Sequence, residues 1–312
     1  MTPFAFVFPG QGSQSIAMLD GWAGHAAVLS TLAEASEALG EDIAGLIRLG
    51  PKEALDLTTN TQPVMLTAGI ACYRAWLAEG GPQPTVVAGH SLGEYSALVA
   101  AGVLSLADAV PLVRLRAQAM QEAVPVGVGA MAAILGLEAD AVTQGCQRVA
   151  TESGEVVEAV NFNDPRQTVI AGSKAGVERA CMVLKELGAK RALPLPVSAP
   201  FHSSLMKPAA ERLRARLAEL NFAAPTLPVV NNVDVLVQTQ PQAIRDALYR
   251  QAFGPVRWVE VVHSLRAHGL IHVFECGPGK VLAGMMKRID PDLHSATVFD
   301  LTSMNAAREM LQ

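Results

Sequence analysis

The clearest chemical signal in the chain is the pentapeptide Gly89-His90-Ser91-Leu92-Gly93, which matches the pattern GxSxG. It lies between an apolar run over 85–88 and a helical run over 94–101, which is the strand, turn and helix context that the pattern requires. The glycines permit a tight turn that exposes the Ser91 hydroxyl at a helix N-terminus, where backbone N–H groups stabilise an oxyanion. We therefore predict that Ser91 is a nucleophile, against the alternative of a glycine-bounded turn with a capping serine.

A serine hydroxyl is a weak nucleophile without an adjacent base, so one of the seven histidines should approach Ser91. His90 is excluded because its side chain points away from its neighbour's in a tight turn, and we expect it to support packing. His202 follows Ala199-Pro200-Phe201 and leads into a helical run. By position alone, a histidine at a helix start is more often a surface or capping residue, so the residues leave its role open.

Arg116 lies on the apolar stripe of a helix expected over 106–122, whereas Arg114 points away from that stripe. A guanidinium directed inward needs an anion, because an unpaired buried charge costs several kcal/mol. The anion is either an internal carboxylate, such as Glu94, or a carboxylate of the substrate held bidentately.

The turn at 8–14, Phe-Pro-Gly-Gln-Gly-Ser-Gln, follows the first apolar run but does not satisfy GxGxxG, so a dinucleotide fingerprint is absent. This turn can bring a backbone N–H, such as that of Gln11, beside the serine turn as a second oxyanion donor.

Strand and helix patterns alternate along the chain, which predicts an α/β fold with a mainly parallel sheet. The expected strands of this sheet are 4–8, 85–88, 227–231, 271–275 and 297–301, and the expected helices include 27–39, 62–77, 92–101, 106–122 and 203–220. A different order of strands and helices begins after the glycine-rich turn at 126–129. It reads strand 130–135, helix 139–150, strands 156–162 and 168–171, helix 177–187 and strand 191–196.

This second order of elements is βαββαβ, which is that of a ferredoxin-like unit. We therefore expect a large α/β-hydrolase-like domain over 1–125 and 198–312, with a small ferredoxin-like subdomain inserted over 126–197. The cleft between the two is the expected ligand site.

The composition fits this fold. The chain has 312 residues, half of them hydrophobic and 17% charged, which excludes a disordered tail or a disulfide miniprotein. We expect no membrane span, because the longest apolar stretch, 85–104, is interrupted by polar residues, and no signal peptide, because the N-terminus lacks a basic region. The four cysteines lack metal-ligand spacing, which favours reduced thiols in a cytoplasmic protein.

The charge is unevenly distributed. Residues 1–155 carry 6 Lys and Arg against 15 Asp and Glu, a net charge of −9, whereas residues 156–312 carry 18 against 14, a net charge of +4. The basic second half suits an acidic partner or a polyphosphate ligand, although ordinary surface variation explains the difference equally well. Neither half is basic enough to indicate nucleic-acid binding.

In combination, these motifs resemble the malonyl-CoA:acyl carrier protein transacylases, the free-standing relatives of acyltransferase domains in fatty-acid and polyketide synthases. The likeness covers nearly the whole chain in family order. The matching stretches are FPGQGSQ at 8–14, GHSLGEYSAL at 89–98, VRLRAQAMQ at 113–121, GAMAAILG at 129–136, NFNDPRQTVIAG at 161–172, APFH at 199–202 and RQAFGPVRW at 250–258.

The resemblance implies that Ser91 is acylated, that His202 is its base and that Arg116 binds the malonyl carboxylate. It implies an oxyanion hole made by the backbone N–H groups of Gln11 and Leu92. The further residues that it implies are Gln251, whose main-chain carbonyl orients the histidine, and Asn161, Asn163 and Gln167, which lie near the thioester and pantetheine entrance. The implied substrates are malonyl-CoA and acyl carrier protein, with no metal or redox cofactor and a monomeric enzyme.

One residue departs from the free-standing bacterial pattern, in which a small residue often precedes the catalytic histidine. Here that residue is Phe201. In the related polyketide domains an aromatic residue at this place accompanies a choice of malonyl over methylmalonyl, so we expect malonyl selectivity. Phe201 leaves open whether the pathway is fatty-acid or polyketide synthesis.

Two rival functions share parts of this pattern. An α/β-hydrolase esterase shares GxSxG and the order of serine before histidine, but it expects a C-terminal histidine with an acidic partner, and neither is evident. A non-catalytic binding subunit would keep the cleft without the reaction, but all the matched catalytic positions are filled.

Overall fold

Strand β1, Phe4–Phe8, is buried along its whole length at the centre of a five-stranded sheet. The computed structural model describes residues 2–197 and 199–312, and in them this sheet has the order β7-β2-β1-β8-β9 with parallel pairing throughout. The other strands are β2 (Val86–Gly89), β7 (Val229–Val230), β8 (His272–Cys276) and β9 (His294–Val298). The apolar run of β1 is thus typical of a parallel strand covered on both faces.

Alternate side chains of β1 enter two separate cores. Phe4, Phe6 and Phe8 join a large cluster with helices on one face, and Ala5 and Val7 join a second cluster on the other face. Helices of the first cluster are α1 (Ala26–Leu39), α2 (Ile43–Leu49), α3 (Lys52–Asp56), α4 (Thr58–Ala78), α5 (Gly93–Ala100), α6 (Leu106–Glu122), α9 (Lys207–Glu219), α10 (Pro241–Gln251) and α13 (Leu301–Glu309). Those of the second are α11 (Trp258–Ala267) and α12 (Val281–Ile289).

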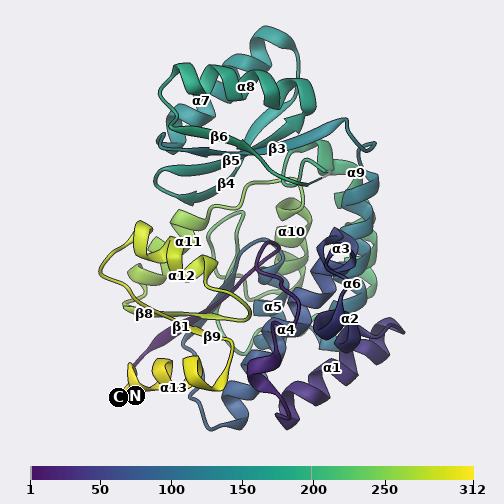
Figure 1. Cartoon of the computed structure of the whole chain (residues 1–312), viewed down its shortest axis with the longest axis vertical. Coiled ribbons are helices and arrows are strands. Elements are labelled where there is room, and N and C mark those ends of the chain that lie inside the picture. The colour runs from purple at the N-terminus through teal and green to yellow at the C-terminus, as the bar shows by residue number, and fades with distance from the viewer. Residues whose placement is uncertain (1, 198) are drawn as a thin grey trace.

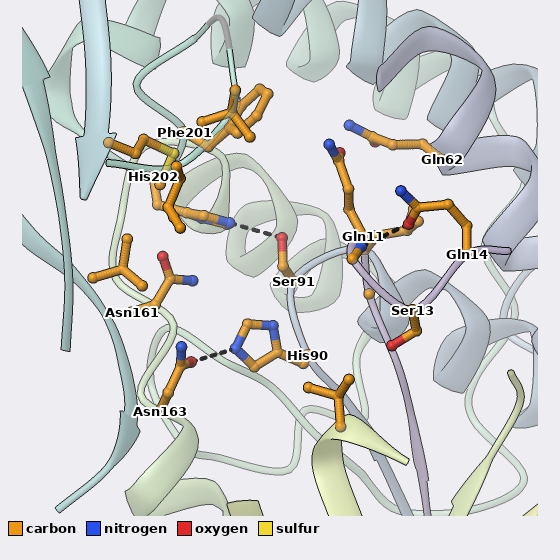
Figure 2. Close-up of a pocket in the computed structure, with 18 of the residues that line it drawn as sticks. Gln11, Ser13, Gln14, Gln62, His90, Ser91, Asn161, Asn163, Phe201 and His202 are labelled. Carbon is orange, nitrogen blue, oxygen red and sulfur yellow. Dashed lines mark hydrogen bonds between the residues drawn. The ribbon is translucent and has the colours of Figure 1, made fainter. Parts of the chain in front are cut away.

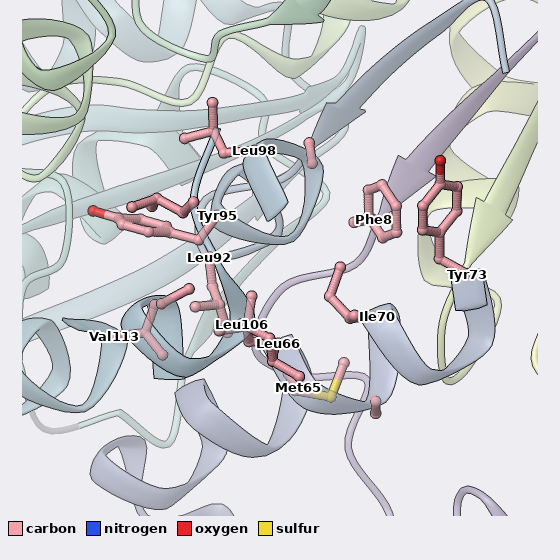
Figure 3. Packing of buried hydrophobic residues seen from close by; sticks show 14 of the residues in the cluster. Phe8, Met65, Leu66, Ile70, Tyr73, Leu92, Tyr95, Leu98, Leu106 and Val113 are labelled. Carbon is pink, nitrogen blue, oxygen red and sulfur yellow. The ribbon is translucent and has the colours of Figure 1, made fainter. Parts of the chain in front are cut away.

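Helix α5 lies within the first cluster. Figure 3 shows its side chains beside those of α6, with Phe8 of β1 near α4. This packing fixes α5 between the sheet and two long helices, so the turn that precedes α5 has a rigid support.

A second sheet lies beyond the ends of the first (Figure 1). Its strands are β3 (Gly129–Leu135), β4 (Val157–Asp164), β5 (Gln167–Ser173) and β6 (Arg191–Pro194), paired antiparallel in the order β4-β5-β3-β6. Helices α7 (Ala139–Ser153) and α8 (Lys174–Glu186) cover one face. The other face, with Met131 and Ala133, packs against the loop that carries Phe201.

The order βαββαβ of this second sheet and its helices confirms the expected sequence of elements. The division into 1–125 with 198–312 and 126–197 stays a prediction, and its positions 1 and 198 lie outside the described residues.

The position predicted for the last strand was wrong. The last strand was expected at 297–301, but β9 is His294–Val298, in register with β8 from His272 onward. Leu301 instead begins α13, because Asp300 caps that helix by accepting a hydrogen bond of 2.6 Å from the Ser303 N–H. Helices α2 and α3 were not expected, and the expected helix 203–220 is a 3-10 turn, Ser204–Met206, followed by α9.

The carboxyl ends of β1, β2 and β7 point to the same edge of the parallel sheet, and Phe8 pairs with Gly89 at that edge. The turns after these strands therefore lie side by side, which is where ligands bind in sheets of this kind. No helix in the described part of the chain is long and apolar enough to cross a membrane.

Phe6 tests how far the first core determines stability. Its ring packs against Trp76 and Tyr73 at centroid distances of 5.2 and 6.1 Å and is fully buried. We expect Phe6→Ala to lower the free energy of unfolding by about 3–5 kcal/mol in a denaturant titration, because it leaves a cavity. Leu49→Ala, at a side chain 70% exposed, is the control and should change it by less than about 0.5 kcal/mol. Equal effects of the two substitutions would contradict the assignment of the core.

Candidate active site

The two glycines of the serine turn are required by close contact. A Cβ on Gly89 would lie 1.9 Å from the carbonyl carbon of Gly93, and a Cβ on Gly93 would lie 2.0 Å from the Phe8 carbonyl oxygen. Ser91 itself has φ +53°, in the left-handed region that side chains rarely adopt. Strand β2, the turn and α5 therefore form the strained elbow that exposes a serine hydroxyl.

His202 approaches this hydroxyl from a segment that follows β6. Its Nε2 lies 2.7 Å from Ser91 Oγ (Figure 2). Its Nδ1 lies 2.9 Å from the main-chain oxygen of Gln251, at the end of α10. Because a carbonyl only accepts, Nδ1 carries the proton and Nε2 accepts from the serine hydroxyl. The structure thus joins Ser91, His202 and Gln251 in one chain of hydrogen bonds, as the expected roles of the three residues require.

The imidazole is buried, and burial together with the charge of Arg116 lowers the pKa of His202 to about 3. The ring is therefore neutral near pH 7, which is the form that accepts a proton. His202 also has φ +66°, so both members of the pair have left-handed backbone.

Arg116 enters the same site from α6 and is 2% exposed. Its guanidinium donates to Gln62 Oε1 at 2.7 Å, Gln251 Oε1 at 3.2 Å and Ser91 Oγ at 3.3 Å. Within the described residues it makes no ion pair with a carboxylate, so the internal salt bridge considered above is absent. Arg114, by contrast, pairs with Glu41 near the surface.

The two expected oxyanion donors come from neighbouring turns. Gln11 follows β1 and Leu92 precedes α5, and both line the cavity beside Ser91. Neither backbone N–H donates to another group among residues 2–197 and 199–312. Both donors are free to bind a ligand oxygen beside the nucleophile.

A cavity of about 570 Å³ lies between the two sheets above these groups. On the parallel-sheet side it is lined by the serine turn, the β1 turn and Arg116; on the other side it is lined by Met131, Val169, Leu195 and Phe201. Its size suits a small acyl group with an attached chain.

Three further predicted residues differ in their placement. Asn161 and Asn163 of β4 line the cavity, and Asn163 Oδ1 lies 2.8 Å from His90 Nε2 (Figure 2). His90 thus packs at the wall of the cleft, which agrees with the packing role expected for it. Gln167 is not among the residues that line the cavity; it begins β5 at the hairpin turn, in register with Leu135 and Asp164.

The sequence reasoning missed Gln62 and Asn232. Asn232, just after β7, accepts from the Ser91 N–H at 2.6 Å and donates to the Gly89 carbonyl at 2.6 Å. Gln62 lies on α4 and holds the Arg116 guanidinium. Neither stands in a recognisable pattern; an inward-facing polar side chain at 62 within an apolar helix was the one available signal.

The described residues contain no group of three or more His, Cys, Asp or Glu that could hold a metal ion. Such an arrangement is suited to acyl transfer, because it combines a hydroxyl with a neutral imidazole, two free backbone N–H groups and a guanidinium 3.3 Å from the hydroxyl oxygen.

Comparisons with known proteins agree with this geometry. The family described as "Acyl transferase domain" matches residues 5–299. The malonyl CoA-acyl carrier protein transacylase of Escherichia coli K12 is 55% identical over 311 residues, which is 99% of this chain and 100% of the relative.

Solved structures agree as well. The crystal structure of an acyl-carrier-protein S-malonyltransferase from Burkholderia pseudomallei is 63% identical, with a TM-score of 0.97, over 99% of this chain and 100% of that one. A type II polyketide malonyl-transacylase, solved in complex with its acyl-carrier protein, is 49% identical, with a TM-score of 0.97 and the same coverage. The chain therefore belongs to the acyl transferase family, among the malonyl CoA-acyl carrier protein transacylases.

Proposed function

We propose that the protein transfers a malonyl group from malonyl-CoA to the phosphopantetheine thiol of acyl carrier protein, by a ping-pong mechanism through a malonyl-serine intermediate. One observation carries the proposal: Ser91 Oγ lies within hydrogen-bond distance of both His202 Nε2, at 2.7 Å, and the Arg116 guanidinium, at 3.3 Å. The names of the relatives support the same reaction.

In the first half-reaction, Ser91 Oγ attacks the thioester carbonyl carbon while His202 Nε2 takes the hydroxyl proton. The carbonyl oxygen becomes an oxyanion that accepts hydrogen bonds from the N–H groups of Gln11 and Leu92. The carbon–sulfur bond then breaks, coenzyme A leaves with the proton held by His202, and malonyl-Ser91 remains.

In the second half-reaction, the phosphopantetheine thiol of the carrier protein gives its proton to His202 and attacks the same carbonyl carbon. The carbon–oxygen bond to Ser91 breaks, and the serine regains its proton from His202. The reaction uses no metal or redox cofactor, because each step is a proton or acyl transfer and the carrier protein brings its own phosphopantetheine.

Arg116 is proposed to bind the free carboxylate of the malonyl group in the fork geometry of its guanidinium. Gln62 and Gln251 hold that fork with neutral oxygens, so the positive charge is not cancelled before substrate arrives. An acetyl group would leave the guanidinium without an anion.

The remaining expectations are proposals too. Asn161 and Asn163 line the route of the thioester and pantetheine arm, and the basic second half of the chain receives the acidic carrier protein. The enzyme acts as a cytoplasmic monomer and supplies fatty-acid or polyketide elongation.

The esterase alternative is less well supported. An α/β-hydrolase orients its histidine with a carboxylate, whereas the Nδ1 partner here is the neutral Gln251 carbonyl. The likeness of the large part of the chain to α/β-hydrolases therefore stays a prediction drawn from the elbow alone.

Intact-mass measurement after brief exposure to malonyl-CoA tests the proposed function. We expect one malonyl adduct on the protein and none on Ser91→Ala, because among the described residues that line the cavity only the Ser91 hydroxyl is hydrogen-bonded to the histidine. Ser13→Ala, at a serine that also lines the cavity, is the control and should still be acylated. Release of free malonate without transfer to a carrier-protein thiol would instead favour the esterase.

Arg116→Ala tests the choice of acyl group. We expect kcat/KM for malonyl transfer to fall roughly thirtyfold or more, which corresponds to a loss of about 2–5 kcal/mol in transition-state stabilisation, while kcat/KM for acetyl transfer is kept or raised. Arg114→Ala, on the same helix but paired with Glu41, should leave the malonyl/acetyl ratio unchanged. A ratio that Arg116→Ala does not alter would discard the carboxylate-binding role.

Phe201→Ala tests selectivity at the α-carbon. Phe201 lines the cavity beside His202 (Figure 2), so its ring leaves little room for an added methyl group. In the variant we expect the ratio of kcat/KM for methylmalonyl-CoA to kcat/KM for malonyl-CoA to rise by the equivalent of about 1–3 kcal/mol. Phe253→Ala, at a ring that packs on Tyr249, is the control. Comparable kcat/KM for both substrates in the unsubstituted enzyme would refute the proposed selectivity.

A further inference from the structure

A carboxyl group is buried directly beneath the nucleophile, and the reaction described above does not use it. Glu94 lies in the first turn of α5 and is 2% exposed. Its Oε2 accepts from the Asn232 N–H at 2.8 Å and from Gln251 Nε2 at 3.0 Å. One oxygen thus joins two residues that come from separate and distant segments.

The first of these residues holds the serine turn. The Asn232 side chain binds the turn on both sides of the nucleophile, at the Gly89 carbonyl and the Ser91 N–H. Glu94 holds the main chain of Asn232 in place. It therefore also fixes the position of the Asn232 side-chain amide, which binds the strained Ser91.

The second residue holds the base and the cation. Gln251 supplies its main-chain oxygen to His202, its Nε2 to the Ser91 carbonyl at 3.0 Å, and its Oε1 to Arg116. An amide has one donating and one accepting end, so its orientation matters. A carboxylate at the nitrogen end keeps the oxygen end toward the guanidinium.

We propose that Glu94 is a positioning residue for acyl transfer: as a carboxylate, it fixes Asn232 and Gln251, and through them the Ser91 turn, the carbonyl that orients His202 and the amide that holds Arg116. The proposal rests on the proposed function. Glu94 makes no ion pair with Arg116 among the described residues, so it acts within the site without occupying the guanidinium.

The ionisation of this carboxyl gives the role a measurable signature. Burial raises the pKa of Glu94 to about 7, against the lowering effects of Gln251, the Asn232 N–H and Arg116. The ionisable groups that face it are Arg116 of α6, Asp234 after β7 and the neighbouring Tyr95. Strands β1 and β2 carry no ionisable side chains.

The carboxylate accepts both hydrogen bonds more strongly than the carbonyl oxygen of the neutral acid does, so the acylation rate should rise with pH through about 7. His202 does not titrate in this range, because its pKa is lowered to about 3. Stability moves in the opposite direction. Because the pKa of Glu94 is raised in the folded state, the neutral acid favours folding. This contribution to the stability of the protein is fully present below the ordinary glutamate pKa of about 4.3 and is lost as the pH rises through about 7. Unfolding driven by Glu94 therefore cannot produce the lower rate at acidic pH.

The experiment measures single-turnover malonylation of Ser91 by intact mass at saturating malonyl-CoA, from about pH 5.5 to about 8.5. It compares the unsubstituted enzyme with Glu94→Gln, Glu94→Asp and Glu275→Gln, and a melting curve is recorded for each. Glu275 of β8 is the matched control, because it is also buried with its pKa raised to about 7, but it binds the Ala283 N–H of α12.

We expect a rate inflection near pH 7 in the unsubstituted enzyme and in Glu275→Gln. In Glu94→Gln we expect a pH-independent rate in that range, roughly tenfold to a hundredfold below the unsubstituted enzyme at the alkaline end, because the reacting atoms lose their alignment. Glu94→Asp should restore an inflection and part of the rate.

A flat profile in the unsubstituted enzyme overturns the proposal, and so does an inflection kept in folded Glu94→Gln or lost equally in Glu275→Gln. If Glu94→Gln does not fold, the unsubstituted and Glu94→Asp profiles decide in the same way. Failure of the proposed function is distinct from these results, because the unsubstituted enzyme would then gain no malonyl mass at any pH.

Discussion

A buried guanidinium whose hydrogen bonds, among the described residues, go only to neutral groups governs the arrangement of this site. Arg116 is almost fully buried; it donates to two glutamine amides and the Ser91 hydroxyl, and it lies over the Tyr95 ring at 5.4 Å. Such a cation is costly unless its hydrogen bonds are satisfied, and an internal carboxylate would satisfy them at the expense of the substrate. The amides of Gln62 and Gln251 resolve this conflict, because they hold the fork in place without forming an ion pair with it. This arrangement is the physical basis of the proposed preference for an anionic acyl group.

Ser91 and His202, the proposed nucleophile and base, also depend on support from the surrounding structure. Ser91 and His202 both have positive φ, and the two residues come from segments that follow different sheets. Local sequence alone does not stabilise such conformations, so the surrounding structure must determine them. The parallel sheet supplies that structure through strand ends: β1 places Gln11, β2 places Ser91 and β7 places Asn232 at one edge. The antiparallel sheet adds the apolar cover over them.

How much of this could be predicted depends on whether the signal is local. The elbow was predictable, because its glycines and its strand and helix context lie within about fifteen residues, and Arg116 was predictable from its place on an apolar stripe. His202 and Gln251 came from the family resemblance alone, since no periodicity connects positions 91, 202 and 251. Asn232 was missed because an asparagine after a two-residue strand has no distinguishing pattern. The last strand was misplaced because its register is set by pairing with β8, whereas the Asp300 cap that ends the run was read as part of the strand.

The low basicity of His202 becomes intelligible when the charge of Arg116 is considered together with its proposed ligand. Burial is the larger cause of the lowered pKa of His202, and the charge of the guanidinium is the second. A neutral carbonyl at Nδ1 orients the ring without offsetting either effect, unlike the carboxylate of a hydrolase triad. A malonyl carboxylate bound at Arg116 would cancel the second cause, because an anion beside the guanidinium removes its repulsion of an imidazolium. In the proposed reaction, the correct substrate thus raises the basicity of the group that must deprotonate Ser91, whereas a neutral acyl group or water alone does not.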